Sequence, residues 1–445
     1  MKNSNIKLPF LGKNISSSST SFITFLFFCS FVFIAYYCLI TCWNYTQISD
    51  FKNYYDEALL YLTMGKMSKQ FLFFQAPGHP FLISKVFSIF DSSNPSLIQF
   101  LNLCQYLTAI VLTHLSFKTE LSWIKYFGTT SLSICVSYLS LMGFLAAEFN
   151  FLFFFVLGNF LLIKYLQKGN FFGILPITFL LLSIALVFGI AQFVRPLSFY
   201  YLLFFGIGLA YLKWFSPKTK LSVIQATLWQ YVLVFIVFLI VSIGLYHNIS
   251  KKWAYQPPQN GLWSIYVGFN AKAKGSYNAE DITQFKKIAE PFDWDGEPLR
   301  TILKPKAIER VKANWLENIR QSPHRAMRLL VPYFTSYWFF AKSIPPNTNP
   351  IWNLLLKAIF MLSTLTVLVS YLSNGIYLVK LFRKKHLNTV EVFAFCALFS
   401  AFLYILIHVF CLEIQPRYAA HLVFLNLWIL PLSLESFIQP NQKFQ

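Results

Sequence analysis

The chain has 445 residues, of which 56% are hydrophobic and only 12% are charged, and 51 of them are phenylalanine. This composition excludes an ordinary soluble globular protein and predicts an all-α polytopic membrane protein. The formal net charge of +20 would suggest nucleic-acid binding in a soluble protein, but much of the excess lies in short loops between apolar runs, as the positive-inside rule requires. We therefore expect no nucleic-acid partner.

Apolar runs long enough to cross a bilayer recur along nearly the whole chain. The first, about residues 21–43, is too long for a signal-peptide core and lacks a small-residue cleavage site, so we expect it to remain as a signal anchor. We predict about ten transmembrane helices. The others cover approximately 96–117, 126–145, 149–166, 174–194, 197–213, 226–247, 351–379, 389–410 and 418–435.

The basic residues predict an orientation. Lys2, Lys7 and Lys13 precede the first run, which indicates a cytoplasmic N-terminus and places the segment after that run outside. Four later basic loops, including the one from Lys380 to Lys385, fall inside under the same assignment. The Phe-rich and Lys-rich composition suits an AT-rich bacterial genome, so we expect an inner-membrane protein with its active face in the periplasm.

Five segments follow from this topology. They are a cytoplasmic N-terminus (1–20), a membrane core (21–247) with a first outer loop (44–95), an extracytoplasmic region (248–350), C-terminal membrane helices (351–435) and a cytoplasmic tail (436–445). We expect interfacial helices in the first loop, such as Phe81–Phe90, a helix over Pro305–Ile319, and an interfacial hairpin over Leu329–Phe340.

Cysteine and histidine give no sign of a metal centre. All seven cysteines lie in or beside apolar runs, and no two histidines have the spacing of metal ligands. We predict no disulfide framework, no metal and no cofactor.

The first outer loop holds the most informative pattern in the chain. Asp50 follows the first apolar run, and an acid at that place can take a proton from an incoming acceptor. The residues around it are Tyr54, Ala58, Gly65 and the knot Pro77-Gly78-His79-Pro80.

This pattern resembles the first extracytoplasmic loop of the GT-C glycosyltransferases, in the branch of the protein O-mannosyltransferases and the lipid A aminoarabinose transferases. The resemblance implies that Asp50 is the catalytic carboxylate and that Tyr54 and His79 help to bind substrate, although the knot more often has Tyr where His79 stands. Asp56-Glu57 is a competing match to the Asp-Glu pair of the mannosyltransferases. We prefer Asp50, because its spacing to the following residues fits better.

Two later elements also match the family. Glu148 lies in a short turn between two runs, on the side of Asp50, and the resemblance implies a role in shaping the acceptor site. Arg195-Pro196 follows the fifth predicted span, and its guanidinium is our first candidate for the lipid phosphate, since arginine binds phosphate with two parallel hydrogen bonds. The alternatives are a snorkelling acid and a cation at a helix C-terminus.

In the large outer loop, the stretch from Gly261 to Tyr277 resembles a glycine-rich and aromatic family segment, with Phe269 in place of the usual first Asn. The resemblance implies substrate binding by Asn270, Lys272 and Lys274. The loop is also basic on the outer side, where attraction of anionic lipid headgroups is the natural interpretation and unrelated solvated charge is the alternative. The basic residues in question are Lys251, Lys252, Lys272, Lys274, Arg325 and Arg328.

The last element, from Glu413 to Tyr418, resembles the family's Glu-x-Arg-Tyr motif with one additional residue. It implies that Arg417 pairs with a carboxylate or the donor phosphate and that Glu413 orients it; the alternative is a structural ion pair at a helix start.

Together these elements imply an inverting transfer of a sugar from a polyprenyl-phosphate donor to a lipid, glycan or protein acceptor on the outer face. Asp50 would be the general base, and Arg195, Arg417 and the loop lysines would hold the phosphate. The rival functions are a lipid or polysaccharide transporter, which predicts charges buried in the middle of helices and repeat symmetry, and a glycan ligase or polymerase, which need not contain the Asp50 pattern.

Overall fold

The computed structural model describes residues 47, 49–117, 122–168, 174–215, 221–254, 257, 260–276, 278–331, 350–384, 386–413 and 419–438. The predicted signal anchor, most of the predicted interfacial hairpin, Tyr277 and Arg417 lie outside these residues.

Every element of the described residues is helical, which confirms the predicted fold class. The segments outside the helix bundle, called the outer helices for that position alone, form α2 (Ser49–Met64), α3 (Lys69–Phe74), α4 (Gly78–Phe90), α12 (Asn260–Gly268), α13 (Ala279–Ala289), a short 3₁₀ helix (Glu290–Phe292), α14 (Gly296–Arg320) and α15 (Ser322–Leu330). The bundle contains α5 (Pro95–Ser116), α6 (Ser122–Ser133), α7 (Val136–Leu139), α8 (Ala147–Lys168), α9 (Ile174–Val194), α10 (Ser198–Phe215), α11 (Leu221–Ser250), α17 (Pro350–Arg383), α18 (Thr389–Cys411) and α19 (Ala420–Ile438).

Eight of the described helices are long and apolar enough to cross a bilayer: α5, α8, α9, α10, α11, α17, α18 and α19. Each coincides with a predicted span, so the chain is a multi-pass integral membrane protein. In the outer part, the predicted helix over Pro305–Ile319 is part of the longer α14, and Phe81–Phe90 belongs to α4.

The predicted span over 126–145 is wrong as one continuous helix. The chain forms α6 and the single helical turn α7, and the segment between α7 and α8 consists of non-helical turns. Side chains of α5 bind the carbonyls of these turns: Gln99 Nε2 donates to Gly143 O (2.7 Å) and Asn102 Nδ2 donates to Phe144 O (2.9 Å). Irregular backbone is tolerated at membrane depth where protein groups satisfy it in this way.

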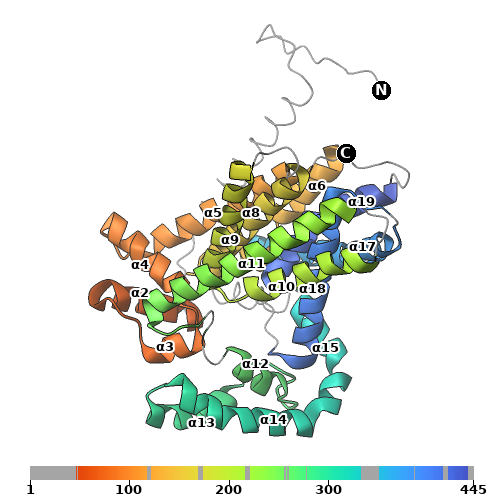
Figure 1. The fold of residues 1–445 in the computed structure, drawn as a ribbon. Helices are drawn as coiled ribbons and strands as arrows, with labels where there is room; N and C mark the ends of the chain where they lie inside the picture. The colour runs from red at the N-terminus through yellow and green to blue at the C-terminus, as the bar shows by residue number, and fades with distance from the viewer. Residues whose placement is uncertain are drawn as a thin grey trace.

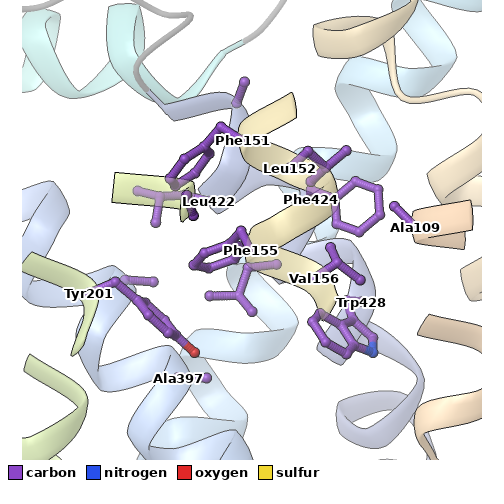
Figure 2. Packing of buried hydrophobic residues seen from close by; sticks show 14 of the residues in the cluster. Ala109, Phe151, Leu152, Phe155, Val156, Tyr201, Ala397, Leu422, Phe424 and Trp428 are labelled. Atoms are coloured by element: carbon purple, nitrogen blue, oxygen red, sulfur yellow. The ribbon is translucent and has the colours of Figure 1, made fainter. Parts of the chain in front are cut away.

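The core of the bundle lies where α8 meets α18 and α19. Figure 2 shows Phe151 and Phe155 of α8 among side chains from α10, α18 and α19. Phe155 and Tyr201 pack edge to face with ring centroids 4.7 Å apart, and both side chains are buried. The Tyr201 hydroxyl donates to Asn159 Oδ1 (2.5 Å), which satisfies both polar groups inside the bundle.

The outer helices have a second, smaller core. In Figure 1, α12, α13 and α14 lie together beyond one end of the bundle. The buried hydrophobic residues of this core are Trp263, Val267, Phe285, Ala289, Leu299 and Leu303, and Phe73 of α3 joins them. Phe73 stacks on Phe285 at 5.7 Å between centroids, so α3 shares one core with α12, α13 and α14.

Candidate functional site

The start of α2, which carries Asp50, is fixed against the turn that precedes α8. Gln47 Nε2 donates to Gly143 O (3.3 Å), and the Leu145 amide donates to Gln47 Oε1 (3.0 Å). One residue after Asp50, Phe51 stacks on Phe144 with centroids 4.8 Å apart. Asp50 itself lies in the first turn of α2 and is half-buried. The structure thus holds Asp50 beside the segment that leads into Glu148.

Glu148 and Arg195 form a buried ion pair. Arg195 Nη1 donates to Glu148 Oε1 at 2.7 Å, and the two side chains are only 12% and 2% exposed. Glu148 stands in the first turn of α8, where the helix dipole favours a carboxylate, and Arg195 follows the last residue of α9. The second carboxylate oxygen, Glu148 Oε2, is buried with no hydrogen-bond partner among the described residues.

The proline-glycine knot lies inside the protein, and its residues Pro77, Gly78, His79 and Pro80 are all buried. A Cβ on Gly78 would lie 2.4 Å from the Phe193 carbonyl oxygen, so only glycine lets the knot approach the end of α9 this closely. Phe193 is two residues before Arg195. The knot therefore positions the end of the helix from which Arg195 projects.

His79 is fully buried and holds the start of α8. Asn150 Nδ2 lies 2.8 Å from His79 Nδ1, and Gln105 Nε2 donates to Asn150 Oδ1 (2.6 Å). Since Asn150 must then donate to the ring, the His79 proton is on Nε2, which donates to Leu145 O (3.0 Å). Burial, as the main cause, lowers the pKa of His79 to about 4, so the ring is neutral at pH 7.

These contacts define what His79 and Tyr54 do in the structure. Both ring nitrogens of His79 are bonded within the protein, which makes it a positioning residue for Leu145 and Asn150 rather than a group open to substrate. Tyr54 is 5% exposed, packs its ring against His79 at 5.0 Å between centroids, and lies with its hydroxyl 3.3 Å from Gln75 Oε1.

The two competing acids of α2 have other partners. Asp56 is exposed and pairs with Lys52 at 2.5 Å, one helical turn away. Glu57 accepts from the Ser68 amide (2.8 Å) and from the Ser68 hydroxyl, and Ser68 is the N-cap of α3. Glu57 therefore stabilises the connection between α2 and α3, and Asp56 lies in a surface pair.

The predicted residues of the large loop do not all face solvent. Asn270 is buried, donates through Nδ2 to Asp281 Oδ2 (2.7 Å) and accepts from the Ala273 amide (3.1 Å), so it holds the fold of its own turn. Lys272 and Lys274 on the same turn are exposed.

Glu413 is buried just beyond the end of α18. Its predicted partner Arg417 lies outside the described residues.

The sequence analysis was wrong about the surface role of Arg325. Its side chain is fully buried and donates to four backbone carbonyls, at Gly268 (2.6 Å), His408 (3.2 Å), Val409 (2.5 Å) and Leu412 (2.7 Å). These carbonyls lie at the C-terminal ends of α12 and α18, where a cation is stabilised by the helix dipole and by the carbonyls that the helix leaves unpaired. Arg325 thus joins the outer helices to the bundle.

The sequence analysis missed a second cation, Arg310, which is half-buried. Arg310 pairs with Asp281 through two hydrogen bonds of 2.9 and 3.0 Å and lies over the Tyr266 ring, 3.6 Å from its centroid. The spacing of the sequence gave no signal for this network, because its three members come from α12, α13 and α14.

Within the described part of the chain, no group of three or more His, Cys, Asp or Glu residues could hold a metal ion. The groups of the candidate site that could take part in acid–base chemistry or bind an anion are the carboxylates of Asp50 and Glu148 and the guanidinium of Arg195.

Comparison with solved structures shows what the fold is similar to. The fold is similar to that of the archaeal oligosaccharyltransferase AglB from Archaeoglobus fulgidus, solved in complex with an inhibitory peptide and a dolichol-phosphate, with a TM-score of 0.52 at 12% sequence identity. The alignment covers 93% of this chain and 50% of that chain, so the chain spans about half the length of this relative. No family model and no curated protein sequence matches the chain.

Proposed function

We propose that this protein is an integral membrane glycosyltransferase that moves a sugar from a polyprenyl-phosphate donor to a lipid, glycan or protein acceptor on the outer face of the membrane. One observation carries the proposal: the buried Glu148–Arg195 pair stands beside the start of α2, which bears Asp50. The fold similarity to an oligosaccharyltransferase solved with a dolichol-phosphate supports it.

The reaction assigns a role to each group. Asp50 takes the proton from the acceptor hydroxyl as the oxygen forms its bond to the anomeric carbon of the sugar. The bond between that carbon and the phosphate oxygen breaks, and the polyprenyl phosphate leaves with the electron pair. Attack opposite the leaving group inverts the anomeric configuration.

Arg195 stabilises the phosphate as it gains charge. A guanidinium has five N–H donors in a planar fork that matches the oxygens of a phosphate, and in this structure one of them bonds to Glu148 Oε1. Glu148 fixes the direction of the guanidinium. The second carboxylate oxygen, Glu148 Oε2, accepts a hydrogen bond from the hydroxyl of the acceptor substrate. From the sequence resemblance we assign Arg417 to the same phosphate and Glu413 to the positioning of Arg417.

The surroundings favour this use of charge. Arg195 is 12% exposed and Glu148 2%, so their field acts in a region of low dielectric, where an oriented cation stabilises a developing charge more strongly than in water. His79, Asn150 and Gln105 fix the backbone next to Glu148 without adding a net charge.

The experiment uses the purified full chain in nanodiscs with a panel of polyprenyl-phosphate sugars and the membrane lipid and glycan fraction as acceptor. We expect transfer of the sugar from at least one donor, with release of one polyprenyl phosphate per sugar transferred. Movement of a labelled lipid across proteoliposome membranes without transfer from any donor would favour the transporter instead.

A further inference from the structure

The turn over 270–276 is pressed against α15 by a close contact at one glycine. A Cβ on Gly275 would lie 1.7 Å from Arg325 Nη1, and the residue has φ +72°. Glycine is therefore required both for the backbone conformation and for the approach. Arg325 is directed into the protein, whereas Lys272 and Lys274 of the turn are exposed and Arg328 of α15 is half-buried.

Three basic side chains, those of Lys274, His324 and Arg328, lie close together. His324 and Arg328 are four residues apart on α15 and share one face, and Arg328 Nη1 donates to Ser276 Oγ (2.5 Å), two residues beyond Lys274. Lys274 and His324 are the chain neighbours of Gly275 and Arg325, which lie in close contact. Burial, and then the charges of Lys274 and Arg328, lower the pKa of His324. Lys274 and His324 are exposed and Arg328 is half-buried.

No carboxylate of the described residues balances this cluster. Neither Lys274 nor Arg328 belongs to any ion pair among those residues. Glu317, one turn before α15, accepts from Gln321 (2.9 Å) and pairs with Arg320 at 3.8 Å. The sequence over 332–349 contains no Asp or Glu. Two like charges are therefore held near one another with no acid shown between them, an arrangement that favours an anionic ligand.

The cluster lies at the level where a membrane span ends. Arg325, next to His324, binds the carbonyls of Val409 and Leu412, and the span of α18 ends at Cys411. In Figure 1, α15 lies beside that end of the bundle. On the same short helix, Met327 is 58% exposed, which gives α15 an apolar group next to its cations, as helices at a bilayer surface have.

We propose that Lys274, His324 and Arg328 form a binding site for the phosphate of an anionic membrane-lipid headgroup. Lys274 and Arg328 supply charge-assisted hydrogen bonds to phosphate oxygens, and the His324 ring supplies an N–H. The site is separate from the Glu148–Arg195 pair, so it stands whether or not the protein transfers a sugar.

The test observes Met327 directly. The full chain, which contains six methionines, is labelled with ¹³C-methyl methionine and placed in nanodiscs of phosphatidylcholine alone or mixed with phosphatidylglycerol. The Met327 signal is assigned with Met327→Leu, and Met64, which is 64% exposed at the end of α2, serves as the internal reference. We expect phosphatidylglycerol to shift the Met327 signal.

The variant Lys274→Gln/Arg328→Gln should weaken the apparent affinity for phosphatidylglycerol by about tenfold or more. The control Lys286→Gln/Lys287→Gln removes the same charge from exposed positions on α13 and should keep the shift. If the double variant loses the signals of the folded state, Lys274→Gln alone gives the same comparison at an exposed side chain.

Three outcomes would overturn the proposal. The Met327 signal could be identical in the two lipid mixtures, or its shift could persist unchanged in the folded double variant. An equal shift produced by inorganic phosphate in phosphatidylcholine nanodiscs would assign the cluster to a soluble anion instead of a lipid.

Discussion

Arg195 and Glu148, 47 residues apart in the chain, meet in a buried ion pair of 2.7 Å that joins the end of α9 to the start of α8. The pair also lies beside the start of α2, because Gln47 binds the backbone at Gly143 and Leu145. A cation and an acid that look independent in the sequence are therefore coupled. We expect the effects of their substitutions on stability to be non-additive.

Stability should reveal this coupling. Arg195→Met should destabilise the protein by about 3 kcal/mol, because it leaves the Glu148 charge buried without its partner. The double variant Glu148→Gln/Arg195→Met should recover much of that loss. Thermal unfolding of the wild type, Glu148→Gln, Arg195→Met and the double variant in the same detergent measures the coupling; strictly additive effects would contradict it.

Arginine at position 195 should matter for its shape as well as for its charge. Lysine keeps the charge but cannot bind a phosphate with two parallel hydrogen bonds, so Arg195→Lys should raise the KM for the polyprenyl-phosphate donor by about tenfold. Steady-state kinetics with the donor varied gives the value. Arg320→Lys, at an exposed position of α14, is the matched control and should leave the KM unchanged. A change confined to kcat would argue against ground-state binding of the donor by Arg195.

His79 should make stability depend on pH. Its pKa is about 4 in the folded protein and about 6.5 when unfolded, so its contribution is complete above pH 6.5 and is lost as the pH falls toward 4. The lost contribution is about 3 kcal/mol. His79→Gln lacks this titration, so the difference in melting temperature between the wild type and the variant should shrink between pH 7 and pH 4.5. A constant difference over that range would refute the assignment.

Gly275 should tolerate no side chain. Gly275→Ala should destabilise the protein by about 2 kcal/mol or more, because its Cβ would collide with Arg325 and its φ is +72°. Gly261→Ala, where a Cβ would meet nothing within 4 Å, is the control and should change stability little. Limited proteolysis of the outer loop measures the same effect locally, and equal protection of the two variants would contradict the role of the contact.

The sequence predicts the spans well where apolar length alone decides the structure, as in α9 and α18. It fails over 126–145, since the turns there are stabilised by Gln99 and Asn102 of a different helix. A local sequence pattern does not show which distant side chain will bind a backbone carbonyl. The apolar composition of 126–145 therefore predicts one continuous helix.

The same physical limit applies to the candidate site. A local pattern led to the prediction that Asp50, Glu148 and Arg195 are site residues, but it did not show that the last two form a pair. Nor does the sequence distinguish an exposed cation from a buried one: Arg325 and Arg328 belong to the same short helix, yet Arg325 is fully buried and binds four carbonyls. Burial depends on the turn at Gly275 and the end of α18, which are far away in the chain.

The proposed transfer depends most directly on Asp50 as the general base. Asp50 stands in the first turn of α2 beside the segment leading to Glu148, whereas Asp56 lies six residues further along the helix, is exposed and pairs with Lys52. Asp50→Asn keeps the size of the side chain but cannot take the proton.

The most direct measurement is the initial rate of sugar transfer from a polyprenyl-phosphate donor by the wild type, Asp50→Asn and Asp56→Asn at equal protein levels in nanodiscs. We predict a loss of about 10²–10⁴-fold for Asp50→Asn and a rate close to that of the wild type for Asp56→Asn. Full activity of Asp50→Asn, with or without a loss in Asp56→Asn, would contradict the account.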